Sequence, residues 1–252
     1  MGRRPLKRVL SEDGSYTAYS EEYDEHYHST KDGALKESLK KHVIPAFLLI
    51  DKDEVNILDI CYGLGFNTLA TLWYYQKNRT GAKLHIYSPE LDASLVASLE
   101  NFTYPEEFLE FREVIVALSQ KGSYTDENFS VEIFLGDARE YVKNFKNHFD
   151  IVYQDAFSPS VNPALWSKEY FSDIKKAMRA EGVLTTYSTA LKTRLALYEN
   201  GFRVYMNSAD DFRTATLASF TELEGFILVN MEHKIRCNPD VKPLSDSDLR
   251  SS

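Results

Sequence analysis

Cysteine is scarce in this sequence, with Cys61 and Cys237 the two examples among 252 residues. Two cysteines cannot build a disulfide framework or a four-cysteine zinc site, and such scarcity is typical of a reducing compartment. Long apolar runs are missing as well, since no stretch of about 18 apolar residues occurs and the first residues lack a signal-peptide core. We therefore expect a cytoplasmic protein that does not cross a membrane.

The sequence also lacks an excess of positive charge. Its net charge is −9, which argues against a surface that grips nucleic acid everywhere but leaves room for a local basic face. Hydrophobic residues make up 43% and charged residues 27%, as in ordinary globular proteins. The length suits one large α/β domain, possibly with a small appendage. Candidate phosphate contacts, each with a solvated surface position as the alternative, are Arg3, Arg4, Lys7, Arg8, Lys192, Arg194 and Arg213.

A glycine loop follows a short apolar run in the stretch ILDICYGLGFN, residues 57–67. The loop, Gly63-Leu64-Gly65, leads into a pattern typical of a helix over 67–78. Glycines let a backbone approach a ligand closely, and the first N–H groups of a helix point toward it. The loop lacks the third glycine of the dinucleotide fingerprint, since Thr68 stands there, so an ordinary strand-to-helix turn remains the alternative.

Acidic residues end three later strands of the pattern. Glu90 follows the strand expected at 83–88 and lies 90 − 65 = 25 positions beyond Gly65, close to the roughly 20 expected for an acid that binds ribose hydroxyls. Asp137 follows the strand 131–135 and could accept from an exocyclic amine or cap a helix. Asp155 follows the strand 149–153 and is the best candidate for chemistry. A surface position is the alternative for Glu90, and Asp92 is a competing acid or a helix cap.

Strands and helices alternate along most of the chain, after a hairpin expected around residues 9–19. This alternation predicts a Rossmann-like, doubly wound, mostly parallel sheet with one antiparallel strand near the C-terminus. We divide the chain into an N-terminal extension, a main domain and a C-terminal tail, at 1–47, 48–230 and 231–252. Further strands are expected at 183–187, 202–206, 214–220 and 225–229, and the last two of these are expected to form a hairpin. Helices are expected at 32–47, 92–120 in two pieces, 166–178 and 192–200. A polar loop is expected at 122–130, and an irregular tail is expected from residue 231.

Aromatic residues crowd the polar stretch 21–35, which precedes a helix that Asp32 is placed to cap. His26 and His28 lack a third metal ligand at sensible spacing, so the pattern does not favour a metal site. Tyr23 and Tyr27 could instead wall a pocket in which a base stacks, or could pack on the surface of the domain.

Several of these segments resemble a known family. The motifs are DICYGLGFN, SPELD, LGDAREYV, the early EEYDEHYHSTKDGALKES, the later TYSTALKTRLALYENGF and RTATLAS, and above all FDIVYQDAFSPSVNPALW. They resemble class I S-adenosylmethionine-dependent methyltransferases, and more narrowly the methyltransferase module of the MnmC family, which modifies the wobble uridine of tRNA. That family's pattern D-x-F-x-P-x-x-N-P-x-x-W is met by Asp155, Phe157, Pro159, Asn162, Pro163 and Trp166.

The resemblance implies N-methylation of an aminomethyl group on the wobble uridine, giving 5-methylaminomethyl-(2-thio)uridine, with S-adenosyl-L-methionine as cofactor and tRNA as partner. The chain would be a stand-alone methyltransferase, since it is too short for the FAD domain that many members carry, and residues 48–230 would be its cofactor-binding domain. Candidate cofactor-binding residues are Tyr62, Gly63, Gly65, Asn67, Glu90, Asp137, Ala138 and Asp155; candidate substrate-binding residues are Tyr23, Tyr27, Phe157, Pro159 and Arg194.

Asp155 is the expected catalytic residue, because it could orient the substrate amine and receive its proton. Three alternatives stay open. An aminopropyltransferase of the spermidine synthase type would share the glycine loop, the ribose acid and an acid at a strand end. A catalytically silent RNA-binding protein could retain the same fold. A nicotinamide dehydrogenase is the weakest alternative, because the third glycine is absent.

Overall fold

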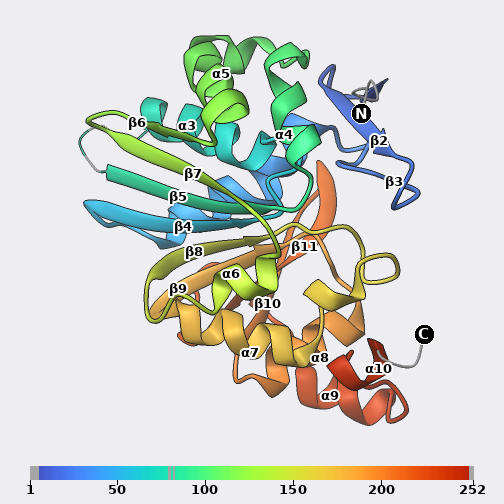
Figure 1. The fold of residues 1–252 in the computed structure, drawn as a ribbon. Helices are drawn as coiled ribbons and strands as arrows, with labels where there is room; N and C mark the ends of the chain where they lie inside the picture. The colour runs from blue at the N-terminus through green and yellow to red at the C-terminus, as the bar shows by residue number, and fades with distance from the viewer. Residues whose placement is uncertain (1–5, 79–80, 82, 250–252) are drawn as a thin grey trace.

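A nine-stranded sheet runs through the middle of the molecule (Figure 1). The computed structural model describes residues 6–78, 81 and 83–249. The strands lie in the order β12-β10-β11-β9-β8-β4-β5-β7-β6. Their bounds are β4 Glu54–Ile60, β5 Lys83–Glu90, β6 Ser123–Thr125, β7 Phe129–Leu135, β8 Phe149–Gln154, β9 Met178–Thr186, β10 Arg203–Ala209, β11 Phe212–Ser219 and β12 Ile227–Leu228.

The parallel strands form the centre of this sheet, as the alternating pattern predicts. From β4 the chain builds outward through β5 to β7, then returns to place β8 on the other side of β4 and continues to β9. Strands β4 and β8 are in register, with Ile57 opposite Ile151 and Ile60 opposite Gln154. The strand order therefore reverses between β4 and β8, and ligands of open α/β sheets bind at such a reversal, beyond the carboxyl ends of the strands.

Strand direction departs from the predicted pattern at both edges of the sheet. Strand β11 runs antiparallel between β9 and β10, and β12 pairs antiparallel with β10 rather than with β11. The predicted hairpin of the last two strands is therefore wrong, because β9 and β10 already occupy both edges of β11. At the opposite edge β6 pairs antiparallel with β7, within the region expected to be a polar loop. Three strands are reversed where the pattern predicted one.

Helices cover both faces of the sheet (Figure 1). One face packs against the helices at 34–49 and α3 to α5, and the other packs against α6 to α8, so the buried apolar side chains form one cluster on each face. The helical segment 34–49 consists of α1 Ala34–Glu37, a π-helical turn η1 Ser38–Val43 and α2 Ile44–Leu49. The others are α3 Phe66–Asn78, α4 Ala93–Ser98, α5 Arg112–Lys121, α6 Ala138–Val142, α7 Lys168–Ala177 and α8 Leu191–Glu199, with short 3-10 turns at Leu99–Asn101, Glu106–Phe111 and Pro163–Leu165.

Two local predictions need correction. Asp32 does not cap the helix that follows it, because Gly33 occupies the N-cap position and the Asp32 carboxylate instead accepts from Lys41 and Arg213. The tail expected to be irregular contains helices α9 Met231–Cys237 and α10 Asp246–Leu249. Asp246 in α10 pairs with Arg139, and this ion pair holds the tail against the body of the protein.

A small antiparallel sheet lies beside the large one, near α4 in Figure 1. It consists of β1 Lys7–Leu10, β2 Tyr16–Ser20 and β3 Glu25–His26, which includes the predicted hairpin. Beyond β2 the chain crosses toward the carboxyl ends of the central strands. In the part of the chain that the structure describes, no helix is long and apolar enough to span a membrane.

Candidate active site

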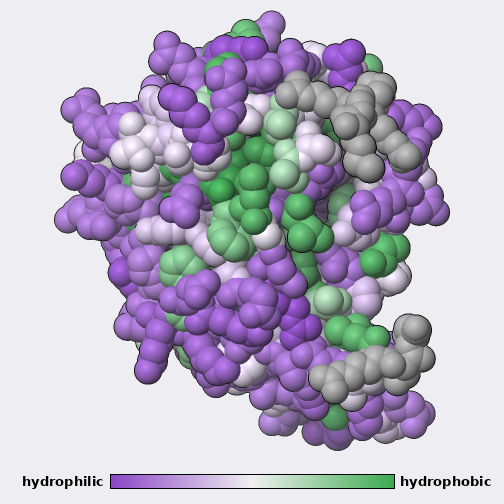
Figure 2. Space-filling view, viewed as in Figure 1, coloured by the Kyte–Doolittle hydropathy of each residue, from purple (hydrophilic) through white to green (hydrophobic). Residues whose placement is uncertain are grey.

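A cavity of about 1070 Å³ lies at the carboxyl ends of the central strands. It is lined by the loop after β4, the end of β5, the beginning of α6, the loop after β8 and residues 20–31. On the face shown in Figure 2, hydrophobic residues gather near the middle, with mainly hydrophilic residues above and below them. The volume lies at the upper end of the roughly 300–1,000 Å³ typical of small-molecule sites.

The glycine loop between β4 and α3 forms one wall of the cavity. Gly63 has φ +54, and a Cβ there would lie 3.3 Å from Cδ1 of Tyr27. Gly65 has φ +76, and a Cβ there would lie 2.6 Å from the hydroxyl oxygen of Tyr62. Side chains are disfavoured by such left-handed backbone angles and also lack space at these two positions. Cys61 adopts φ 65 on the same loop, and burial raises the pKa of its thiol well above its usual value, so it is a poor nucleophile.

Glu90 faces this loop from the end of β5. Its Oε2 accepts a hydrogen bond of 2.8 Å from the Gly63 N–H, and its Oε1 accepts one of 2.9 Å from the Asp92 N–H. Burial raises the pKa of the Glu90 carboxyl, although both backbone N–H groups oppose this shift. A carboxylate oxygen has about two acceptor positions, so each oxygen of Glu90 can still accept a hydroxyl. Asp92 itself caps α4, accepting from the N–H groups of Ser94 and Leu95.

Asp137 begins α6 and lines the same cavity together with Ala138. Its carboxylate caps the helix by accepting from the Arg139 N–H at 2.7 Å. The side chain is exposed, and its second oxygen is available to a donor in the cavity. Both interpretations of Asp137, helix cap and ligand acceptor, are therefore compatible with its position.

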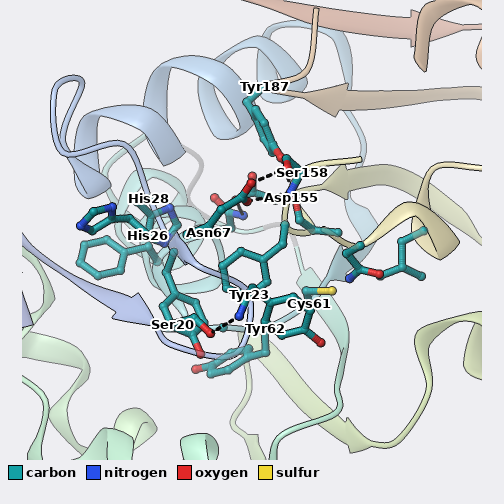
Figure 3. A pocket seen from close by; sticks show the side chains of 18 of the residues that line it. Ser20, Tyr23, His26, His28, Cys61, Tyr62, Asn67, Asp155, Ser158 and Tyr187 are labelled. Carbon is teal, nitrogen blue, oxygen red and sulfur yellow. Dashed lines mark hydrogen bonds between the residues drawn. The ribbon is translucent and has the colours of Figure 1, made fainter. Parts of the chain in front are cut away.

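Asp155 follows β8 and lines the cavity, with its carboxylate beside Asn67 (Figure 3). Its Oδ2 accepts from Nδ2 of Asn67 at 2.8 Å, and its Oδ1 lies 3.5 Å from Nε2 of His42. Its side chain is only 8% exposed, and burial alone would raise the pKa of the carboxyl. The opposing effects of His42, His28 and Asn67 nevertheless hold that pKa below its usual value. Asp155 is thus an ionised acceptor within a largely buried site.

Residues 21–30, here called the N-terminal strap, close the cavity over the loop after β8. The Tyr23 ring stacks on Phe157 with centroids 4.5 Å apart, and the Tyr27 ring lies 5.0 Å from Phe157. Glu25 accepts a hydrogen bond of 3.0 Å from the Ser158 N–H and a second, very short one from the Ser158 hydroxyl. The strap therefore joins the small sheet to the loop that carries Asp155.

Not every predicted site residue lies in the cavity. Gly65 and Pro159 do not line it, although both neighbour residues that do. Arg194 is wrongly placed by the prediction, because its side chain is 8% exposed and its Nε donates to Thr216 inside the protein. Sequence alone could not reveal that Arg194 lies on the inward face of α8. Arg3 and Arg4 fall outside the described residues. The other predicted cofactor-binding and substrate-binding residues line the cavity, namely Tyr23, Tyr27, Tyr62, Gly63, Asn67, Glu90, Asp137, Ala138, Asp155 and Phe157, whereas the candidate phosphate contacts Lys7, Arg8 and Lys192 do not.

Two residues of the site, His42 and Glu25, are not indicated by the sequence. His42 lies within a helical pattern, 113 positions before Asp155 (155 − 42), and no local motif connects the two residues. Glu25 belongs to an acidic run whose members cannot be ranked from sequence. Within the described ranges, no three His, Cys, Asp or Glu side chains are grouped as they would be around a metal ion.

Comparison with known proteins agrees with this geometry. Residues 104–218 match a family described as S-adenosyl-L-methionine-dependent methyltransferase. A glycine loop, an acid at the end of the second parallel strand and a cavity at the point where strand order reverses agree with the class I methyltransferase fold.

The chain is also similar to a crystal structure of MNMC2 from Aquifex aeolicus, with a TM-score of 0.83 and 30% identity over 97% of this chain and 80% of that one. The chain therefore belongs to the S-adenosyl-L-methionine-dependent methyltransferases of the MnmC2 type. An uncharacterized protein from Methanocaldococcus jannaschii, MJ0670, is 32% identical over 77% of this chain and 53% of its own length. A tRNA 5-methylaminomethyl-2-thiouridine biosynthesis bifunctional protein MnmC from Psychrobacter cryohalolentis is 25% identical over 84% of this chain and 35% of its own length. This chain thus spans about half and about a third of these two relatives.

The residues present fit the cofactor of this family. The oxygens of Glu90 have remaining capacity for hydroxyl donors, and Gly63 of the glycine loop lines the cavity beside them. Oδ1 of Asn67 is buried without a hydrogen-bond partner among the described residues. A buried polar atom of this kind needs a hydrogen-bond partner, which a bound ligand or a water can supply.

Proposed function

We propose that this protein transfers a methyl group to the aminomethyl nitrogen on the wobble uridine of a tRNA, giving 5-methylaminomethyl-(2-thio)uridine. The observation that carries the proposal is the ionised Asp155 in a cavity whose acidic lining favours a cationic amine. The names of the MnmC relatives supply the particular amine. The acids of that lining are Glu22, Glu25, Glu37, Glu90, Asp92, Asp137 and Asp155.

The cofactor would be held by the residues that end the parallel strands. The backbone of Gly63 would lie against its methionine part, the carboxylate of Glu90 would accept its ribose hydroxyls, and Asp137 would accept from its adenine amine. When bound, S-adenosyl-L-methionine supplies an electrophilic methyl group on a positively charged sulfur. Because the attacking nitrogen must lie in line with that methyl, positioning is the main contribution of the protein.

Asp155 would orient the amine and accept a proton from it. An amine attacks only in its neutral form, whereas primary ammonium groups titrate near pH ~10.4. A nearby carboxylate stabilises the ammonium form, so Asp155 does not make the amine more acidic. It binds the ammonium by a charge-assisted hydrogen bond and receives the proton as the nitrogen attacks. Asn67 fixes the carboxylate for this task through its 2.8 Å hydrogen bond.

The aromatic wall would hold the uridine. Tyr23 and Phe157 are already stacked, and Tyr27 lies against the same ring, so a base can contact the flat apolar surface of this aromatic group. Phosphate contacts would come from a local basic face. Arg213 lines the cavity with a side chain 61% exposed, although Asp32 already neutralises part of its charge. Lys31 lines the cavity too.

Mass analysis of wobble nucleosides tests this proposal. The protein is incubated with methyl-labelled S-adenosyl-L-methionine and with tRNA that carries an aminomethyl wobble uridine. We expect one labelled methyl group per modified nucleoside, and tRNA that carries an unmodified wobble uridine is the control. Labelled product from neither tRNA would contradict the proposal. Putrescine with the decarboxylated cofactor, tested in parallel, would instead give product if the chain were an aminopropyltransferase.

A further inference from the structure

A fully buried histidine lies directly behind the carboxylate of Asp155. His42 belongs to η1, its side chain is 0% exposed, and its Nε2 lies 3.5 Å from Oδ1 of Asp155. On the other side of the ring, Nδ1 lies 2.8 Å from the hydroxyl oxygen of Thr185 in β9. Among the described residues, Nε2 makes no well-formed hydrogen bond. The ring is therefore fixed at one nitrogen and faces Asp155 with the other.

Charged groups approach this imidazole from several elements. Asp155 comes from the loop after β8, Asp59 from β4, and His28 from the N-terminal strap, and each interacts electrostatically with His42. The Tyr153 ring of β8 packs edge-on against it, with centroids 5.7 Å apart. Lys41, on the same helical turn, is neutralised by its ion pairs with Asp32 and Glu37. The carboxylate of Asp155 is thus the group nearest to the free nitrogen.

We propose that His42 is a positioning residue that accepts, through Asp155, the proton released in methyl transfer. This inference rests on the proposed role of Asp155. With the ring hydrogen on Nδ1 donated to Thr185, the Nε2 lone pair faces Asp155 and is ready to accept. The substrate ammonium gives one proton to Asp155, and its nitrogen lone pair forms the new bond to the methyl carbon. The carbon–sulfur bond breaks and the sulfur keeps its electron pair. The proton then moves from Asp155 to Nε2.

Proton affinities support this sequence. An ordinary carboxyl titrates near ~3.9, an imidazole near ~6.5 and a primary ammonium near ~10.4. Asn67 donates a hydrogen bond of 2.8 Å to the Asp155 carboxylate and favours its charged form, so a proton resting on that carboxyl is unstable. The ordinary pKa of an imidazole is more than two units closer to that of the ammonium than the pKa of a carboxyl is. Moving the proton to the imidazole also restores the negative charge of Asp155 opposite the newly methylated, positively charged nitrogen. Once the product has left, the proton returns to solvent by way of Asp155.

Replacing the histidine by glutamine separates proton acceptance from shape. The amide of Gln in H42Q can still hydrogen-bond to Asp155, but it cannot accept a proton. We expect kcat with aminomethyl-tRNA to fall roughly tenfold to a hundredfold, with KM and the Kd for S-adenosyl-L-methionine changed by less than about threefold. His148 lies at the opposite end of β8, so H148Q is the matched control and is expected to keep the wild-type rate.

The pH profile distinguishes this role from a merely structural one. If the imidazole accepts the proton, activity should fall on the acid side, and H42Q should lose this decline. Burial raises the pKa of Asp59 to about 7, so Asp59 titrates in the same range. D59N is therefore measured as well, and it should keep the decline.

Nitrogen-15 NMR of the protein without cofactor supplies a readout independent of activity. The signal that disappears in H42Q is His42, and its shifts should show the Nδ1–H tautomer; the Nε2–H tautomer would overturn the inference. If H42Q does not fold, T185V keeps the imidazole but removes the hydroxyl that fixes it, and kcat should fall several-fold. A wild-type rate in H42Q would refute the role of His42 but not the proposed function. If H42Q does not fold, a wild-type rate in T185V would have the same meaning. An inactive wild type would instead refute the proposed function.

Discussion

Replacing Asp155 by asparagine removes the proposed proton acceptor and barely changes the shape of the site. The amide oxygen of Asn in D155N can still accept from Asn67, which donates to Asp155 at 2.8 Å. Its NH₂ group then faces Nε2 of His42, a nitrogen that makes no well-formed hydrogen bond in the described structure. The variant can therefore satisfy its buried polar groups, and we expect it to fold.

The expected loss of activity follows from the role of the carboxylate. Proton acceptance by a positioned side chain contributes about 10²–10⁴-fold to a rate. At about 1.36 kcal/mol per factor of ten, this range corresponds to about 2.7–5.4 kcal/mol of barrier. In the described structure Asp155 accepts a hydrogen bond from Asn67 and makes none with Gly63 or Glu90, so the Kd for S-adenosyl-L-methionine should change less than about threefold.

Single-turnover methyl transfer and calorimetry measure the two quantities separately. Asp173 lies in α7 and pairs with Lys176 outside the cavity, so D173N is the control substitution and should react at the wild-type rate. The pKa of Asp155 is lowered in the folded state, so its charge stabilises the protein above the unfolded value near ~3.9, and this stabilisation is lost as pH falls through the folded value. D155N should therefore melt below the wild type at pH 7. Turnover within threefold of wild type would refute the role of Asp155.

Three further predictions concern the loop, the buried acid and the strap. G63A should bind S-adenosyl-L-methionine at least about tenfold more weakly by calorimetry, because its Cβ would be strained at φ +54 and would press on Tyr27 at 3.3 Å; unchanged affinity would contradict this. Raising the pH from 5 to 8 should lower the free energy of unfolding by about 3 kcal/mol through Asp59. Burial raises the pKa of Asp59 to about 7, so the stability present at low pH is lost as the pH rises from the unfolded to the folded pKa of this carboxyl. Urea unfolding across this range should show a flatter profile for D59N, and equal profiles would refute the assignment. E25A removes both acceptors of Ser158 and should speed cofactor dissociation several-fold in stopped-flow experiments, whereas an unchanged off-rate would show that the strap does not retain the ligand.

Local patterns in the sequence were sufficient for the architecture of the centre. Apolar runs followed by helical periodicity identify β4, α3, β5, β7 and β8, because the side chains of each element repeat with its own period. Parallel strands must place their carboxyl ends at one edge, so Glu90, Asp137 and Asp155 were expected together and line one cavity. The family motif around Asp155 identified the class of enzyme.

The pairing of strands at the edges of the sheet could not be predicted from local sequence patterns. Strand β12 joins β10 rather than its neighbour in sequence, because both edges of β11 are already hydrogen-bonded, and no local pattern reports which edge is free. Arg194 resembled a phosphate contact in the sequence, yet the rotation of α8 directs its side chain inward to Thr216. Only packing determines which face of a helix is buried when apolar and polar residues are mixed along it.

The sequence by itself determined the alternating α/β order, the glycine loop and the three acids at strand ends, because these depend on neighbours within a few residues. Tertiary structure alone decided what surrounds Asp155. His42 and Thr185 are 143 positions apart, yet their side chains lie 2.8 Å from each other. Such contacts exist only after η1 packs on the sheet, so the buried environment that keeps Asp155 ionised is a property of the folded chain.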